Sequence, residues 1–434
     1  MIVSKYVLLF EQDNMYFLFN SKNNSFLELN KDLYEELLSF KKGEDSFLLE
    51  DDAIVKSLVD LGVLTTDIDD QSFLDGIILK QNIWSYSRQI MNLTIAPTIQ
   101  CNLRCPYCFE VSKPKSIISY EICNDIFEFI KRNSDNSFVN LTWFGGEPLL
   151  AIDRMEYILQ RLELNNIKIN FHSIITNATL LRGKVLDVFE RFPLNHIQIT
   201  FDGVKDNHDK LRVYPTGKGS FDVIMCNLDE FVVRCPSSFI SIRVNVGKHN
   251  SHDYFEFKET IARKYPKAAN IYVYPGILRG DNDCGYKTNF FSTKELSTFH
   301  TSLSRNDENV FFPTSICKGC IATQSNSFVI GPKGELYKCL EDIGIREREI
   351  GSVVDDKFRN SSLFKRYMIH GTFVNDKRCL GCSILPICSG GCPRSRLENK
   401  FDGGKNTLCD HYILENRQSL KEMLFQYYLQ QKNK

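Results

Sequence analysis

Three cysteines, Cys101, Cys105 and Cys108, stand close together with three and then two residues between them. Thiolates at this spacing can converge on one soft metal centre. On a four-iron cube, three protein ligands leave one iron open to a substrate or cofactor, so the pattern predicts a cluster that takes part in chemistry. A structural zinc site is the alternative, but zinc usually takes four ligands in paired C-x2-C form.

A second and larger set of cysteines lies in the last third of the chain. Its eight thiols are enough for two further centres, so the sequence predicts an iron–sulfur enzyme with several clusters. The set comprises Cys317, Cys320, Cys339, Cys379, Cys382, Cys388, Cys392 and Cys409.

Charge and hydropathy limit the partners and the cellular compartment that can be expected for this protein. The 434 residues carry 53 basic and 54 acidic side chains, a balance that gives no reason to expect nucleic acid or an anionic membrane as partner. Glu11 and Asp13 end the first apolar run too early for a signal peptide, and no later segment is long enough to span a bilayer. We therefore expect a cytoplasmic protein, whose reducing surroundings favour metal ligation over disulfides.

Strand and helix patterns alternate through residues 91–310, which predicts an α/β domain. Six such units favour a parallel sheet curved into a partial (β/α)6 TIM-like barrel. Enzymes of this build place their sites at the carboxyl ends of the strands, and the three cysteines follow the first strand. The strands are expected near residues 92–96, 139–143, 170–175, 196–201, 239–246 and 270–274.

The flanking segments have a different character. Residues 1–67 combine three short strand patterns with helical ones, which predicts a winged-helix domain. Residues 68–90 are polar and mixed, and we expect a linker with some helix. Residues 311–410 are rich in cysteine and glycine and need metal to hold them together. Residues 411–434 are expected to form a closing helix.

The first cysteine loop, with Tyr107 before its last cysteine and a strand before its first, resembles the signature of the radical S-adenosylmethionine (SAM) superfamily. The resemblance implies that SAM chelates the open iron of a [4Fe–4S] cluster. An electron from the cluster then cleaves SAM to methionine and a 5′-deoxyadenosyl radical. It makes Cys101, Cys105 and Cys108 the catalytic ligands and places Tyr107 near the adenine.

Two further motifs resemble elements of the same family. Gly145-Gly146-Glu147-Pro148 resembles its GGEP turn, which implies that the Gly146 carbonyl and the Glu147 carboxylate accept hydrogen bonds from the SAM amine. Thr200-Phe-Asp202-Gly resembles its S-x-D-G element, with threonine where serine is commoner. This second match implies contacts from Thr200 and Asp202 to polar groups of SAM.

Three other side chains are candidates for SAM contacts. Arg212 is expected to hold the SAM carboxylate, to order its loop or to form a surface salt bridge. Arg243 is a second candidate for that carboxylate. Asn177 follows the third strand and could contact the ribose, although a turn residue at this place has a competing structural role.

The spacing of the second cysteine set resembles the SPASM domain, which implies two auxiliary [4Fe–4S] clusters and three clusters in all. One cluster would take Cys320, Cys339 and Cys392, with Cys317 as candidate fourth ligand. If Cys317 does not ligate, that cluster has an open iron. The other cluster would take Cys379, Cys382, Cys388 and Cys409.

Residues 1–67 resemble a recognition element for ribosomally made, post-translationally modified peptides. The resemblance implies that the leader of a precursor peptide binds along a sheet edge near residues 25–29. A domain that only supports the barrel is the alternative.

The whole pattern resembles a radical SAM/SPASM peptide maturase that installs a thioether or carbon–carbon cross-link and draws electrons from a flavodoxin or ferredoxin. An anaerobic sulfatase-maturing enzyme, a peptide epimerase and a non-catalytic electron-transfer protein remain as alternatives.

Overall fold

The computed structural model describes residues 1–44, 51–108, 116–134, 138–266, 268–278, 289–306, 319–355, 357–388, 390–409 and 414–432. The chain divides into two compact units, each assembled from segments that are distant in sequence. The barrel unit contains Ser87–Ser292 and Asn326–Phe364. The other, here called the terminal unit, contains Met1–Tyr86, Thr293–Ser325 and Lys365–Lys434.

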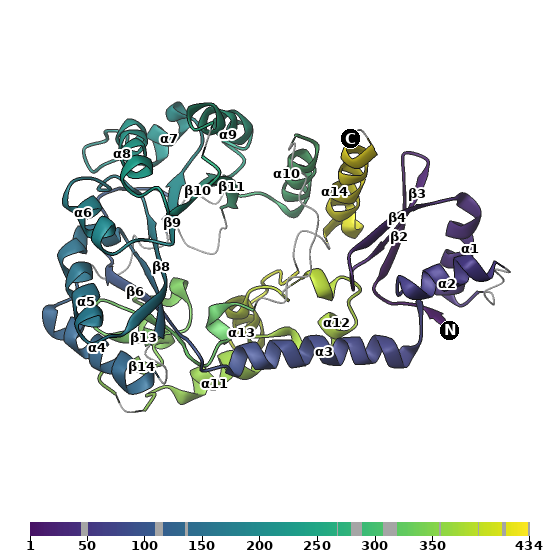
Figure 1. Ribbon diagram of the computed structural model, residues 1–434, viewed down its shortest axis with the longest axis horizontal. Helices are drawn as coiled ribbons and strands as arrows, with labels where there is room; N and C mark the ends of the chain where they lie inside the picture. The colour runs from purple at the N-terminus through teal and green to yellow at the C-terminus, as the bar shows by residue number, and fades with distance from the viewer. Residues whose placement is uncertain are drawn as a thin grey trace. The chain divides into compact units, whose positions relative to one another are not determined.

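Six consecutive parallel strands form the centre of the barrel unit, which confirms the predicted α/β class with a parallel sheet (Figure 1). Each strand pairs with the next along the chain, as expected when a helix returns the chain between them. The strands are β6 (Met91–Thr98), β7 (Phe138–Gly145), β8 (Lys168–Thr176), β9 (His196–Phe201), β10 (Phe239–Val246) and β11 (Ile271–Ile277).

The sheet continues beyond β6 with three short strands from the later, cysteine-rich part of the chain. Strand β12 (Ser327–Ile330) pairs parallel to β6, and β13 (Glu335–Tyr337) and β14 (Gly351–Ser352) follow antiparallel. The result is one sheet of nine strands, and residues 326–364 belong structurally with the barrel.

Apolar and polar side chains alternate along the strands, and this alternation determines which face of the parallel sheet the helices cover. Ile197, Ile199 and Ile242 are completely buried, whereas the intervening Thr200 and Arg243 are half-buried and point to the opposite face. The helices therefore pack on the apolar face, and the polar face lines the barrel interior. These helices are α4 (Tyr120–Asn133), α5 (Ile152–Leu164), α6 (Lys184–Arg191), α7 (Lys205–Leu211), α8 (Phe221–Arg234) and α9 (Asp253–Lys264).

In the terminal unit, the N-terminal module is built on an antiparallel sheet in the order β2–β3–β4. Asn30 caps the helix that follows, as its position predicts, by accepting a hydrogen bond from the Leu33 amide. A long helix, α3, occupies most of the stretch expected to be a linker. The elements are β1 (Ile2–Val3), β2 (Val7–Gln12), β3 (Met15–Asn20), β4 (Ser25–Leu29), α1 (Lys31–Lys42), α2 (Asp52–Asp60), β5 (Leu64–Thr65) and α3 (Asp67–Tyr86).

The two faces of this sheet bury different partners. One face packs on α1 and α2 through a core that includes Leu18 and Leu37. The other face packs on helix α14 (Leu414–Lys432) and on the second cysteine segment, with Phe17 and Ile387 in one core. Ser21 also donates a hydrogen bond to a carbonyl of that segment. The N-terminal module therefore shares a core with residues that connect the predicted cluster ligands.

The rest of the terminal unit is helical or irregular. Helix α10 (Thr293–Asn306) lies against α14, where Ser297 and Ser419 form a buried hydrogen bond of 2.8 Å. The short α12 (Lys377–Leu380) and α13 (Pro393–Phe401) carry or flank cysteines of the second set.

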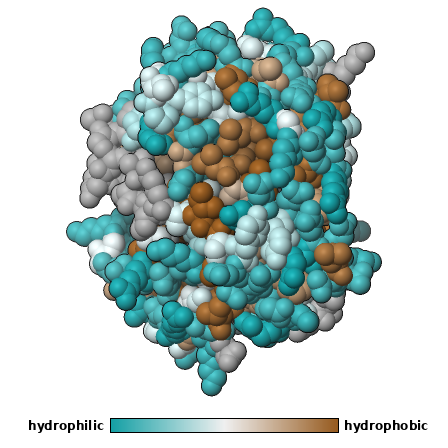
Figure 2. Space-filling model, turned by 90° about the vertical axis from the view of Figure 1, so that its left-hand side faces the viewer, coloured by the Kyte–Doolittle hydropathy of each residue, from teal (hydrophilic) through white to brown (hydrophobic). Residues whose placement is uncertain are grey.

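No helix in the described part of the chain combines the length and the apolar character needed to cross a bilayer. The face shown in Figure 2 is mostly hydrophilic, with apolar side chains gathered near its middle. Exposed apolar residues of this kind are common on folded proteins.

Candidate active site

The first cysteine loop begins directly after β6. The Cys101 sulfur accepts hydrogen bonds from the Leu103 amide at 3.4 Å and from the Asn177 side chain at 3.7 Å. Burial and, next, the Glu147 carboxylate raise the pKa of Cys101 to about 12. The free thiol is therefore protonated near neutral pH, so that loading a metal cluster onto it must release a proton. Donors aimed at a sulfur are the surroundings that a cluster ligand requires.

The GGEP turn packs against the chain that leads into Cys101. The Gly146 amide donates to the Thr98 carbonyl at 3.1 Å, and the Glu147 amide donates to the Gln100 carbonyl at 2.8 Å. Gly145 has a φ of +126°, which favours glycine. A Cβ on Gly146 would lie 2.4 Å from the Gln100 oxygen. Only glycine permits this approach, so the turn fixes the position of the cysteine loop.

We predict that Gly146→Ala lowers the free energy of unfolding by about 1–3 kcal/mol, because the added methyl group must displace backbone that cannot yield cheaply. Denaturant titration of the cluster-free protein measures this loss, and equilibrium binding should show weaker affinity for SAM. Gly76→Ala is the control, since no atom lies within 4 Å of its added Cβ. Equal stability of the two variants would contradict the packing described above.

Glu147 is completely buried and ties the end of β7 to the turn after β8. Its Oε1 accepts from the Thr176 hydroxyl at 2.7 Å and from the Leu149 amide at 3.0 Å, and its Oε2 accepts from the Asn177 amide at 2.8 Å. Burial raises the pKa of Glu147, and these hydrogen bonds oppose the rise. A carboxylate offers about four acceptor positions. One therefore remains, which suits a single further N–H donor such as an amine.

Asn177 braces the cysteine loop from the same turn. Besides its contact with the Cys101 sulfur, its side-chain amide donates to the Asn102 side chain at 3.0 Å. Its oxygen accepts from the Thr179 amide at 2.9 Å, and Asn102 donates in turn to the Thr179 hydroxyl at 2.8 Å. These contacts give Asn177 a structural role, while its contact with a ribose stays a prediction.

Tyr107 joins the cysteine loop to a buried ion pair. Its hydroxyl donates to Asp202 at 2.5 Å and accepts from Arg212 at 3.1 Å and from Asn245 at 3.2 Å. Arg212 and Asp202 lie 3.9 Å apart with side chains 8% and 0% exposed, so Arg212 does not form a surface salt bridge. Burial raises the pKa of Asp202, whereas Arg212 and the Tyr107 hydrogen bond lower it. The three groups form one network that orders the loop around Cys105 and Cys108.

His208, which no sequence pattern singled out as a site residue, contacts this network through the backbone of Asp202. The Asp202 amide donates to His208 Nδ1 at 3.4 Å. With Nδ1 as acceptor, Nε2 carries the proton and donates to the Ser220 hydroxyl at 3.0 Å, which donates to the Arg212 carbonyl at 2.7 Å. Burial holds the pKa of His208 well below its usual value, so the ring is neutral. Asn245 is a second supporting residue that sequence reasoning missed.

Thr200 and Arg243 meet on the polar interior face of the sheet. The register places Arg243 of β10 between Thr200 of β9 and Tyr274 of β11. The Arg243 Nε donates to Asn245 at 3.0 Å, and a Cβ on Gly276 would lie 2.2 Å from that nitrogen. Glycine at this position gives the guanidinium room to pass over β11. The structure thus brings a cation and a hydroxyl together near the Asp202–Arg212 pair.

The second cysteine set is divided between the two units. Cys339 lies in the barrel unit, directly after β13, and Cys317 lies outside the described residues. The described residues hold no group of three cysteine, histidine or acidic side chains close enough for one metal ion. A cube of four irons separates its thiolates more widely than one ion does, so the ligand sets stay predictions. The set's members in the terminal unit are Cys320, Cys379, Cys382, Cys388, Cys392 and Cys409.

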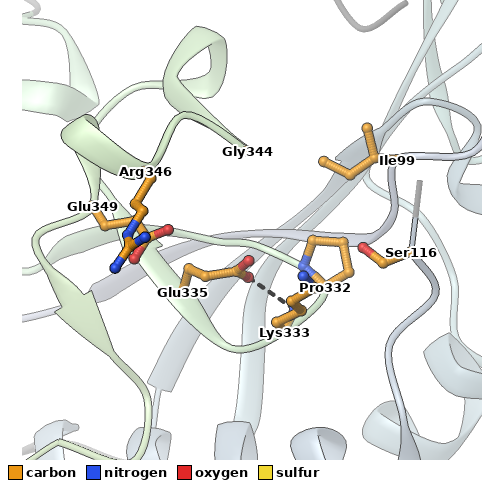
Figure 3. A pocket seen from close by; sticks show the side chains of 8 residues that line it. All are labelled: Ile99, Ser116, Pro332, Lys333, Glu335, Gly344, Arg346 and Glu349. Atoms are coloured by element: carbon orange, nitrogen blue, oxygen red, sulfur yellow. Dashed lines mark hydrogen bonds between the residues drawn. The ribbon is translucent and has the colours of Figure 1, made fainter. Parts of the chain in front are cut away.

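A pocket of about 250 Å³ lies beside Ile99, two residues before Cys101 (Figure 3). It is lined by charges of both signs, among them Glu335, Arg346 and Glu349. Burial and the neighbouring Glu335 raise the pKa of Glu349. None of the predicted site residues lines this pocket, so it does not belong to the network around the cysteine loop.

Comparison with known proteins decides the family of this site. The model of the radical SAM superfamily matches residues 95–277, which include the cysteine loop, the GGEP turn and the Asp202–Arg212 pair. The protein is a radical SAM enzyme. As such it has SAM and a [4Fe–4S] cluster as cofactors, and Cys101, Cys105 and Cys108 have the chemistry and the surroundings to hold the cluster.

Among curated relatives, the cysteine-type anaerobic sulfatase-maturating enzyme of Clostridium novyi is 28% identical over 73% of this chain and 91% of its own length. The radical SAM cyclopropyl synthase TigE of Paramaledivibacter caminithermalis is 24% identical over 92% and 91%. The solved structure of native anSMEcpe with bound AdoMet and Kp18Cys peptide has a TM-score of 0.60 at 19% identity, and the match covers 79% of this radical SAM enzyme and 98% of that chain. These similarities confirm the prediction of a radical SAM/SPASM-type maturase.

Proposed function

We propose that this radical SAM enzyme modifies a ribosomally made precursor peptide and installs a thioether or carbon–carbon cross-link. The observation that carries the proposal is the N-terminal module, because among the described residues its strand β4 pairs only with β3. An extended leader peptide can add to the last strand of a sheet. The similarity to TigE extends over 92% of the chain, whereas the similarity to the sulfatase-maturating enzyme leaves more than a quarter unmatched.

In this proposal the residues of the barrel bind and orient SAM. Cys101, Cys105 and Cys108 would hold the [4Fe–4S] cluster, which would supply the electron for the reductive cleavage of SAM. The Gly146 carbonyl and the remaining acceptor position of Glu147 hold the amine of SAM. Arg243, a cation on the polar interior face, faces its carboxylate, and Thr200 contributes a hydroxyl. Arg212 acts indirectly, since its guanidinium is engaged with Asp202 and Tyr107.

The second cysteine set would hold two auxiliary [4Fe–4S] clusters that accept the electron left after cross-linking. A flavodoxin or ferredoxin would supply electrons to the SAM-binding cluster. The described surroundings of two candidate ligands support this assignment, because the sulfurs of Cys379 and Cys388 each accept a hydrogen bond, from Arg396 at 2.9 Å and from the Gly390 amide at 3.4 Å.

We predict that the precursor peptide protects the backbone amides of β4 from hydrogen exchange when it binds the full-length enzyme. The protection follows from hydrogen bonds between the peptide and the strand edge. Exchange measured by mass spectrometry with a candidate precursor peptide, taken from a short reading frame next to this gene, tests it. The amides of α4 in the barrel unit serve as internal control. No saturable protection at Ser25–Leu29 would mean that the module only supports the barrel.

Sulfatase maturation is the second candidate, and the 28% identity to the Clostridium novyi enzyme favours it. A peptide that carries a sulfatase cysteine motif distinguishes the two functions. Conversion of its cysteine to formylglycine, detected by mass, would support sulfatase maturation. Modification of the precursor peptide alone would support the proposed function.

A further inference from the structure

Arg396 makes a direct hydrogen bond to one of the predicted cluster ligands. Its Nη2 lies 2.9 Å from the sulfur of Cys379, and its side chain is only 6% exposed. Arg396 belongs to α13 and Cys379 to α12, both marked in Figure 1. A buried guanidinium is costly unless its charge is paired, and Asp376 pairs this one. The additional hydrogen bond to a sulfur points to a role that involves this sulfur.

Contacts with two further residues fix the direction of the guanidinium. The Arg396 Nη1 donates to Asp376 at 2.8 Å. Its Nε donates to the Gly390 carbonyl at 2.8 Å, and its Nη2 donates to the same carbonyl. Hydrogen bonds from Arg378 and Arg396 hold the pKa of Asp376 well below its usual value, so the carboxylate is charged. Gly390 has a φ of +79°, and a Cβ on it would lie 2.7 Å from the Phe373 Cβ. The backbone conformation and the space beside Phe373 therefore favour glycine at this position.

We propose that Arg396 is a positioning residue that raises the reduction potential of the auxiliary cluster bound by Cys379. The inference rests on the proposed function, which makes Cys379 a cluster ligand. An N–H donor on a ligand sulfur and a nearby positive charge both stabilise the additional electron of the reduced cluster. The cluster then accepts an electron from the modified substrate more readily.

A purely structural role would use the same contacts to hold the segment between α12 and α13. Stability alone therefore cannot test the proposal, whereas a reduction potential can. The matched control is Arg394, which lies on the same helix and pairs with Glu398 at 3.3 Å. Arg394→Gln and Arg396→Gln remove the same charge from α13, and Arg396→Gln also removes the hydrogen bond to the Cys379 sulfur.

The measurement is a redox titration followed by electron paramagnetic resonance. It uses the full chain with Cys101, Cys105 and Cys108 replaced by alanine, so that only auxiliary clusters give signals. At a fixed potential, Arg396→Gln should lower the ratio of reduced to oxidised cluster roughly tenfold, which corresponds to about 59 mV for one electron. Arg394→Gln should change it little. Equal ratios in the two variants, at full iron content, would overturn the proposal.

Two more variants keep the outcomes separate. Cys379→Ala must lower the bound iron, and unchanged iron would refute the ligand assignment of the proposed function rather than the role of Arg396. If Arg396→Gln itself fails to hold iron, Arg396→Lys decides, because it keeps the charge but loses the planar donor pair. The lysine variant should show a smaller shift in the same direction. An unshifted potential in this variant would overturn the proposed hydrogen-bond effect.

Discussion

Replacing Cys101, Cys105 and Cys108 together by alanine is expected to reduce the formation of 5′-deoxyadenosine to the level found without enzyme. The three thiols are the only cysteines of the loop between β6 and α4, and Gly146 and Asn177 hold that loop in place. Without them no cluster can present an open iron to SAM. The assay is anaerobic reconstitution with dithionite, followed by chromatography of the nucleoside product.

Cys226→Ala is the control for this experiment, since Cys226 is exposed on α8 and belongs to neither cysteine set. It should retain the activity of the parent enzyme and its iron content. If the triple variant still forms 5′-deoxyadenosine at the parent rate, the assignment of the catalytic loop is wrong.

Arg212→Leu should strongly destabilise the barrel unit. It would leave Asp202 buried without its cationic partner, and breaking such a pair costs roughly 3–5 kcal/mol of unfolding free energy. Denaturant titration of the cluster-free protein measures the loss. Arg212→Leu combined with Asp202→Asn should recover part of it, because no buried charge then remains. A double variant less stable than the sum of the single changes would contradict the pairing.

The pH dependence of this loss has a definite sign. Burial already raises the pKa of Asp202 above its unfolded value, and removal of Arg212 raises it further. A carboxyl group whose pKa is higher in the folded state than in the unfolded state binds its proton more tightly in the folded state. The free energy of unfolding therefore falls as the pH rises from the unfolded-state pKa to the folded-state pKa. The unfolded value is about 3.9. Arg212→Leu should therefore be less destabilising near pH 5 than near pH 8, when each is compared with the parent protein.

The cysteine loop and its GGEP partner could be predicted from sequence because their chemistry depends on residues close together in the chain. Gly145 and Gly146 indicate a close backbone approach, and the structure shows that approach to Thr98 and Gln100. The six parallel strands could be predicted for a similar reason, since each alternates with its own helix.

Other parts of the site could not be read from local patterns. Glu147 bonds residues some thirty positions away, and Tyr107 reaches Asn245 at a separation of 138 residues. In the sequence, His208 has the pattern of any helix residue, and only the fold brings its ring to the Asp202 amide. Strands β12 to β14 are too short for their pairing to be predicted from sequence. The register of β12 is set by the edge of β6, and β13 and β14 each pair with the strand before them.

Deuterium transfer from the peptide to 5′-deoxyadenosine tests the central claim most directly. The reconstituted enzyme is incubated with SAM and with a candidate precursor peptide, taken from a short reading frame next to this gene and labelled with deuterium in its core residues. Radical peptide modification predicts deuterium in the 5′-deoxyadenosine and a peptide that is two hydrogens lighter. Unlabelled 5′-deoxyadenosine together with a peptide of unchanged mass would contradict it.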